Sequence, residues 1–386
     1  MNNLEIMLSS IRTQICGGEA VSFGEISQEQ MKALYAYSKA QDMAHVVATE
    51  LDRQKMLDVD EDIGNKFRKQ QFIALMRYER INYELEEVCR LFEERGISHL
   101  PLKGAIIRRY YKEPWMRTSA DIDMLVKEED IDRAREALKE ALEYREGEQG
   151  THYDYSFFAL SGVHLELHYR TMASDRAVNS HSVLERMWEN SVLEDGWNYR
   201  YVNSDEMFYF YHIAHMVKHF ENKGCGVRFF LDLWILCHGK EYDREKRNEL
   251  LEQGQMSKFA EAAELLADVW FSGGEHTALT RAMEAYLLNG GIYGSRENMI
   301  VTSQIKKGGK FGYLMSKLFL NYDKMTLYYP SIKGKKWLLP AYNIRRWFRI
   351  VFCGGLVRSI NDLKRSSQIC ENKVDDVENL LRQLGI

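Results

Sequence analysis

A chain of 386 residues that is 45% hydrophobic and carries a formal net charge of −5 is long enough for two or three globular domains of about 150 residues each. No stretch approaches the roughly 18 uninterrupted apolar residues of a membrane span, and the first residues lack the features of a signal peptide, so we expect a soluble cytoplasmic protein without a transmembrane segment. The six cysteines form no CxxC pair, which argues against a disulfide scaffold or zinc knuckle and predicts reduced thiols.

Residues 1–95 have the pattern of a helical N-terminal region. Ser27 and Gln30 form a candidate capping box ahead of an amphipathic stretch. Apolar residues then recur at helical spacing from Ile63 to Arg95, and the pattern stops at Gly96. The sequence predicts a long helix that leads into the next region.

Residues 96–180 change to a β-α-β-α order, followed by a hairpin. The short apolar run at 97–102 and the run at 120–126 predict strands, and the segments at 104–111 and 127–144 predict helices. Alternating runs at 153–160 and 163–170 flank Ser161-Gly162, a dipeptide typical of a hairpin turn. We therefore predict a core of mixed α and β structure in this region.

Residues 181–386 are predicted to form a mostly helical C-terminal domain. Ser204 is a candidate N-cap for one helix, with Asp205 and Glu206 in its first turn, and a second helix is expected from Val227 to His238. A last helix is expected over residues 374–385.

Segment 302–350 is strongly basic, with eleven lysines and arginines against one aspartate, a charge of +10 that leaves −15 for the rest of the chain. Aromatic residues lie between these cations. Such a segment fits RNA, an anionic membrane surface, or the acidic body of its own protein. We favour the last, so a nucleic-acid partner is considered but not preferred.

Three carboxylates are the candidate catalytic and metal-binding residues. Asp121 and Asp123 alternate with apolar residues in a predicted strand, so both side chains leave the same face. Glu166 lies on the polar face of another predicted strand, between His164 and His168. Carboxylate oxygens suit Mg²⁺, and two such ions can stabilise both oxygens of a phosphoryl displacement. Isolated acidic pairs are also common at strand ends without any chemistry, and the histidines would line either a cleft or a solvated sheet face.

Candidate nucleotide contacts lie just before the acidic strand. Lys103-Gly104 marks a turn from a strand into a helix, where free backbone N–H groups and a glycine let a phosphate approach. The alternative is an ordinary turn with an exposed lysine. Arg117 could bind triphosphate oxygens or pair with the nearby acids.

Further cleft or acceptor candidates come from the helical half. His212, His215 and His219 share one helix face, but without HExxH or a carboxylate partner they fit a metal site poorly. Arg228 and Asp232 stand four residues apart, so they could pair along their helix or line the same cleft.

The runs LKGAIIRRYY, RTSADIDMLV and HLELHYR resemble the uncharacterised bacterial nucleotidyltransferases of the polymerase-β-like superfamily, and HIAHMVKH and RFFLDLWIL resemble their helical half. The resemblance implies an α+β fold with a small mixed sheet. It also implies an Mg²⁺-dependent reaction with an NTP as substrate, and Asp121, Asp123 and Glu166 as the metal-binding acids. The chain departs from the usual Gly-Ser turn, because Lys103-Gly104-Ala105 has no hydroxyl for phosphate.

Three hypotheses follow for function. The first is transfer of an NMP group from an NTP to an unidentified hydroxyl on a small molecule, an RNA or a protein. The second is a glycosyltransferase that holds a nucleotide sugar through its DxD pair, although here about a hundred mainly helical residues precede the pair. The third is a catalytically silent module on the same fold that binds nucleotide, RNA or membrane.

Overall fold

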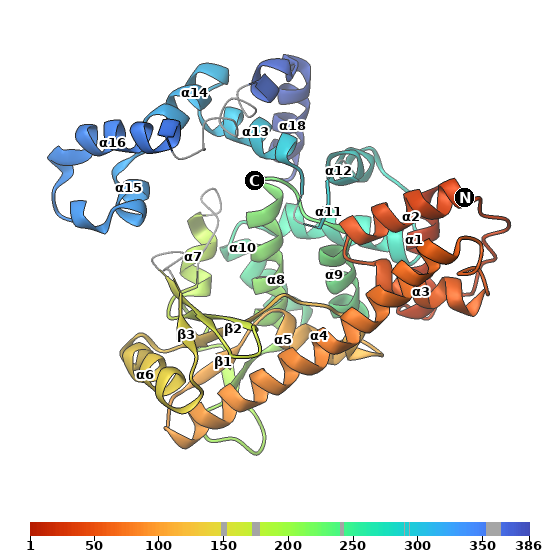
Figure 1. Cartoon of the computed structure of the whole chain (residues 1–386), viewed down its shortest axis with the longest axis horizontal. Coiled ribbons are helices and arrows are strands. Elements are labelled where there is room, and N and C mark those ends of the chain that lie inside the picture. Colours follow the sequence, from red (N-terminus) through yellow and green to blue (C-terminus); the bar gives the residue numbers. More distant parts are fainter. Residues whose placement is uncertain (148–152, 172–177, 240–242, 289, 293, 353–363) are drawn as a thin grey trace.

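The computed structural model describes residues 1–147, 153–171, 178–239, 243–288, 290–292, 294–352 and 364–386. These ranges are mainly helical and contain a five-stranded and a two-stranded sheet. Figure 1 shows the long helix α4 running from the N-terminal helices to the larger sheet.

Four helices form the N-terminal region: α1 (Asn3–Gln14), α2 (Gln28–Ala40), α3 (Ala44–Arg53) and α4 (Glu61–Glu94). Ser27 caps α2 as expected, since its hydroxyl accepts the N–H of Gln30. The predicted capping box is only half formed, because the Gln30 amide donates to the Met1 carbonyl instead. The predicted helix from Ile63 to Arg95 is confirmed as α4.

The larger sheet is mixed and has the strand order β1-β2-β5-β4-β3. Only β2 and β5 pair in parallel; the other neighbours are antiparallel. In the parallel pair Asp121 lies beside His164, and Asp123 lies beside Glu166. The strands are β1 (His99–Pro101), β2 (Asp121–Val126), β3 (Arg145–Glu146), β4 (Asp154–Phe158) and β5 (His164–His168).

The two faces of this sheet differ in polarity because side chains alternate along each strand. Ile122 and Met124 of β2, with Leu165 of β5, pack into a buried cluster with apolar residues of α4 and of α6 (Ile131–Ala141). The opposite face carries Asp121 and Asp123 together with the polar residues of β5. One face therefore anchors the sheet, and the other is left for polar chemistry.

The predicted order of elements in residues 96–180 is confirmed for the described residues, except that the sequence did not predict β3 between α6 and the hairpin. A short helix α5 (Gly104–Ile107) and two 3-10 turns (Arg108–Tyr110, Pro114–Met116) connect β1 to β2, and a third turn (Glu128–Asp130) precedes α6. Strands β4 and β5 form the predicted hairpin. Gly162 takes a φ of +84° in its turn, a conformation that glycine adopts without strain.

The region after the sheet is helical, with one exception that the sequence analysis missed. Strands β6 (Ser191–Leu193) and β7 (Tyr201–Asn203) form a small hairpin, and the His99 N–H donates to the Tyr199 carbonyl beside β1. Such short strands show too few alternations to be seen in sequence. The helices are α7 (Val178–Leu184), α8 (Asp205–Phe220), α9 (Val227–Gly239), α10 (Arg244–Gln253), α11 (Ser257–Phe271) and α12 (Ala278–Leu288).

Ser204 caps α8 as predicted, since its hydroxyl accepts the N–H of Met207 at 3.2 Å. A buried apolar cluster joins α1–α3 to α8–α11. The N-terminal helices therefore share a core with the later helices. The division at residues 95 and 180 remains a prediction of the sequence.

The C-terminal part contains α13 (Arg296–Lys306), α14 (Lys310–Leu318), α15 (Tyr322–Tyr328), α16 (Leu339–Phe352) and α18 (Glu371–Gln383), with 3-10 turns at Pro330–Ile332 and Lys336–Leu338. Figure 1 shows α14, α15 and α16 projecting beyond the rest of the molecule. Lys306, at the start of the basic segment, pairs with Glu221 at 3.4 Å. In the described ranges no helix has both the length and the hydropathy to cross a membrane.

Candidate active site

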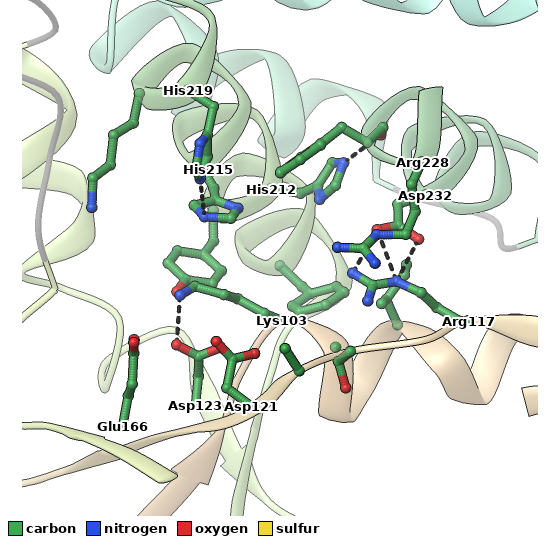
Figure 2. Close-up of a pocket in the computed structure, with 18 residues that line it drawn as sticks. Lys103, Arg117, Asp121, Asp123, Glu166, His212, His215, His219, Arg228 and Asp232 are labelled. Atoms are coloured by element: carbon green, nitrogen blue, oxygen red, sulfur yellow. Dashed lines mark hydrogen bonds and ion pairs between the residues drawn. The ribbon is translucent and has the colours of Figure 1, made fainter. Parts of the chain in front are cut away.

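A cavity of about 340 Å³ lies between the polar face of the sheet and helices α8 and α9. Its walls contain Lys103, Asp121, Asp123 and Glu166 from the sheet side. Figure 2 shows these residues across from the histidines of α8. The cavity thus brings together the acids and the turn residues that the sequence singled out.

The turn before α5 is shaped by its backbone. Lys103 has a φ of +46°, a left-handed conformation that costs a residue with a Cβ about 1–2 kcal/mol. At Gly104 a Cβ would lie only 3.1 Å from the Ser119 Cβ and 3.3 Å from Arg117 Nη1. The two residues therefore bring the chain close to the segment before β2, and Lys103 enters the cavity.

Three carboxylates and two histidines from adjacent strands form the polar centre of the site. Ligand atoms of Asp121, His164 and Glu166 lie within 4.8 Å of one another, and so do those of Asp123, Glu166 and His168. Carboxylate oxygens from two strands at this spacing fit a hard divalent cation such as Mg²⁺. The imidazoles would extend the choice to Mn²⁺ or Zn²⁺.

Asp123 is the most strongly stabilised of the acids. Lys103 Nζ lies 2.5 Å from its Oδ1, and His168 Nε2 lies 3.0 Å from the same oxygen. Burial acts to raise the pKa of Asp123, but Lys103 and His168 outweigh it and hold the pKa well below its usual range. Asp123 is therefore ionised at neutral pH.

Asp121 has the opposite electrostatic environment. Burial, and then the charge of Asp123, raise the pKa of Asp121, while Lys103 acts to lower it. The pKa of Glu166 is lowered, chiefly by a hydrogen bond from His168, whose Nε2 lies 3.5 Å away. Two neighbouring acids are thus neutralised by protein cations, and Asp121 is the one that a further cation would stabilise most.

The histidines of β5 have different surroundings. The pKa of His168 is raised, since Asp123 and Glu166 outweigh the effect of its burial. His164 lies 3.2 Å from the Ser156 hydroxyl and stacks on Phe158. His168 therefore contacts two of the acids directly, and His164 lies at the edge of the cluster.

Helix α8 forms the facing wall. His215 and His219 are joined by a 3.0 Å contact between their Nε2 atoms, so one ring donates and the other accepts. Burial, followed by Lys218, lowers the pKa of His219 to about 3, and burial also lowers the pKa of His215. Both imidazoles are neutral. His212 donates to the Phe229 carbonyl at 3.0 Å and helps to join α8 to α9.

Lys218 is a cavity residue that the sequence analysis missed. It follows His215 by three positions and Tyr211 by seven, which places all three on one side of α8. That spacing was the available signal. Burial, then the charge of Lys103, lowers the pKa of Lys218. It gives the helical wall a cation opposite the acids.

Arg117 lies in the cavity wall but does not pair with the acids of β2. Its guanidinium forms a buried bidentate ion pair with the Asp232 carboxylate, with Nη2 2.8 Å from Oδ2 and Nε 3.0 Å from Oδ1. Tyr111 donates to the same carboxylate at 2.6 Å. The suggested pairing of Arg117 with the acidic cluster is therefore wrong, because Asp232 of α9 offers an ideal partner within the buried interface.

The suggested pair of Arg228 and Asp232 along α9 is also wrong. Arg228 Nη1 lies 2.6 Å from Asp42 Oδ2 and also donates to the Thr118 carbonyl. Each residue has a better-placed partner outside its own helix. Both residues line the cavity, which agrees with the other hypothesis from the sequence, that they line the same cleft.

The Lys103–Asp123 pair makes a first testable prediction. A cation entering the cluster must share Asp123 with the ammonium, so Lys103→Met should bind Mn²⁺ about tenfold more tightly without nucleotide, an effect of about 1.4 kcal/mol. Titration of Mn²⁺ followed by electron paramagnetic resonance measures this. Unchanged or weaker Mn²⁺ binding would contradict it. The exposed Lys69, changed to Met, is the control.

The small mixed sheet, the DxD strand and the third acid on the neighbouring strand define a nucleotidyltransferase core of the α+β class, as predicted. The sequence profile of the family described as "Uncharacterised nucleotidyltransferase" matches residues 27–272, and the chain belongs to this family. No curated protein and no solved structure matches the chain. Family membership supports nucleotidyl transfer as the general activity, with an NTP and a divalent metal as participants.

Proposed function

We propose that this protein transfers an NMP group from an Mg²⁺-bound NTP to a hydroxyl group of an acceptor. The observation that supports this most is the meeting of Asp121, Asp123 and Glu166 at one wall of a cavity that also contains cationic side chains. Mg²⁺ held by these acids would neutralise charge on the phosphates and on the attacking and leaving oxygens.

The transfer is a displacement at the α-phosphorus. The acceptor oxygen forms a bond to Pα, the bond from Pα to the bridging oxygen of the β-phosphate breaks, and pyrophosphate leaves. Glu166 is the proposed acceptor of the hydroxyl proton, since His168 holds it as a carboxylate. Asp121 and Asp123 would hold the metal, which would supply positive charge beside the reacting phosphate.

The phosphates need cations on the side of the cavity away from the acids. Lys103 and Gly104 border the acids, and Lys218 faces them from α8. Arg117 and Arg228 already pair with Asp232 and Asp42. We therefore assign phosphate contact mainly to Lys218, and Lys103, which pairs with Asp123, would join it where a metal takes over that carboxylate. The neutral pair His215–His219 is assigned to the acceptor side.

Lys218 provides a second testable prediction. Removing a hydrogen bond to a charged phosphate costs about 1.5–3 kcal/mol, so Lys218→Met should weaken binding of Mg²⁺-NTP by at least about tenfold. Calorimetric titration of the variant and of the Lys69→Met control measures this. If Lys218→Met binds the NTP as tightly as the unaltered protein, Lys218 makes no phosphate contact.

The proposed activity is tested by titrating ATP, GTP, CTP and UTP with Mg²⁺ by calorimetry, then incubating the bound nucleotide, labelled at the α-phosphate, with cell extract. Binding that Asp121→Asn removes, together with transfer of label to an extract component and release of pyrophosphate, supports the proposal. Binding without transfer indicates the silent module instead. Hydrolysis of a sugar nucleotide without NTP turnover indicates a glycosyltransferase.

A further inference from the structure

The projecting helices α14, α15 and α16 expose an unusual number of large apolar side chains. Phe311 is 74% exposed, Trp337 is 77% exposed and Phe348 is 61% exposed. We call residues 307–350 the arm. Its exposed large hydrophobic residues are Phe311, Met315, Phe319, Tyr328, Trp337, Ile344, Trp347 and Phe348. Exposed apolar groups in this number mark a surface for interaction rather than a solvated helix.

The apolar residues are arranged in rows. Phe311, Met315 and Phe319 follow one another at intervals of four along α14 and its end, which places them on one side of the helix. Ile344 and Phe348 have the same spacing on α16. Each helix therefore presents an apolar stripe.

The ends of the two rows meet. The rings of Phe319 and Trp347 lie 5.5 Å apart, and the Trp347 indole N–H donates to the Leu318 carbonyl at 2.7 Å. Asn343 adds a second link, because its side-chain oxygen accepts the Leu320 N–H at 2.9 Å. These contacts fix α16 against the end of α14, so the two stripes lie on neighbouring helices of the arm.

The arm is also strongly basic, with ten of the eleven cations of segment 302–350 and its one aspartate, a charge of +9. Arg345 and Arg349 extend over the ring of Tyr329, at 5.4 and 5.3 Å from its centre. Lys333, Lys335 and Lys336 precede α16 and are exposed. Cations thus flank the apolar stripe, with long stems that let their charges reach a neighbouring polar layer.

We propose that the arm binds the surface of a membrane rich in anionic lipids. A helix with aromatic and aliphatic residues on one side and lysine and arginine around it lies in the plane of the headgroups, its apolar stripe in the acyl region. Each cation near an anionic leaflet adds to the attraction. Both halves of this signature are present on the arm.

Other occupants fit the surface less well. Two copies of the arm would bring two strongly positive surfaces together, which disfavours self-association through this face. RNA would match the charge and stack on aromatic rings, but aliphatic groups such as Met315 and Ile344 give it nothing to stack on. The arm extends away from the body in Figure 1, and a planar surface can reach it there.

The test is flotation of the full chain with two kinds of vesicle. One contains phosphatidylcholine alone, and the other contains phosphatidylcholine and phosphatidylglycerol in equal parts. We expect at least about tenfold tighter binding to the anionic vesicles, which salt weakens. Phe311→Ser combined with Phe348→Ser should reduce this binding about tenfold or more, since both rings are exposed. Phe72→Ser, at a 63% exposed phenylalanine of α4, is the matched control.

Several outcomes would overturn the proposal. These are equal binding to neutral and anionic vesicles, binding to polyuridylate but not to vesicles, or unchanged vesicle binding by the double serine variant with a native circular dichroism spectrum. If the double variant is unfolded, Lys335→Glu with Lys336→Glu replaces it, and unchanged binding then has the same meaning. The result does not depend on the nucleotide site, whose activity is measured separately.

Discussion

Asp121→Asn is expected to reduce nucleotidyl transfer by about 10³-fold or more. A metal held by these acids would supply several kcal/mol of charge stabilisation, and each 1.4 kcal/mol is a factor of ten in rate. Initial rates of pyrophosphate release with Mg²⁺-NTP measure this loss. The same variant should also lose Mn²⁺ affinity, so the effect is visible before an acceptor is known.

The same substitution should leave the fold intact or slightly more stable. The pKa of Asp121 is raised in the folded protein, chiefly by burial and by Asp123, so its ionised form opposes folding above the pKa of the unfolded chain. A neutral amide removes that repulsion. Urea unfolding at neutral pH should therefore show an unchanged or higher midpoint.

The exposed Asp132 of α6, changed to Asn, is the control for this experiment. It removes the same charge from a neighbouring element and should change neither activity nor metal binding. If Asp121→Asn retains transfer activity within a few-fold of the unaltered protein, the carboxylate is not a metal ligand in the reaction.

Asp232→Ala is expected to lower the free energy of unfolding by about 3–5 kcal/mol, because it leaves the buried Arg117 guanidinium without its partner. The Tyr111 hydroxyl loses its acceptor at the same time. In the folded protein the pKa of Asp232 is lowered, since Arg117 outweighs the effect of burial. Its contribution is therefore present at neutral pH and is lost as the pH falls through the acidic range. Urea unfolding followed by circular dichroism measures the loss.

A paired substitution separates the loss of a partner from the loss of packing. Arg117→Met with Asp232→Leu replaces the ion pair by apolar side chains and should regain most of the stability, because no unpaired charge remains. If the double variant is as unstable as Asp232→Ala, packing of the interface rather than charge compensation is responsible. Glu249→Ala, at an exposed position of α10, is a control for acid removal.

The sequence predicted the parts of the site that follow from local periodicity. Alternation along β2 and β5 placed Asp121, Asp123 and Glu166 on polar faces, and the parallel register then set Asp123 beside Glu166. The family resemblance supplied the expectation that the three acids act together as metal-binding residues. Local pattern and family together were enough for the sheet wall of the cavity.

Contacts between segments that are distant in the chain could not be predicted from the sequence. Arg117 and Asp232 are 115 positions apart, whereas the i,i+4 spacing of Arg228 and Asp232 suggested a local pair that tertiary partners displaced. Lys218 was missed because a lysine on a helix is usually solvated. Only the docking of α8 over the sheet makes it part of the cavity.

The left-handed backbone at Lys103 constrains how this protein can change. A glycine there would relieve about 1–2 kcal/mol of conformational strain, yet it would remove the ammonium that neutralises Asp123. A residue with a side chain but no charge would keep the strain and lose the pair. Because removing one partner of a buried ion pair costs about 3–5 kcal/mol, more than the backbone strain, selection for stability and selection for activity both retain a lysine at position 103.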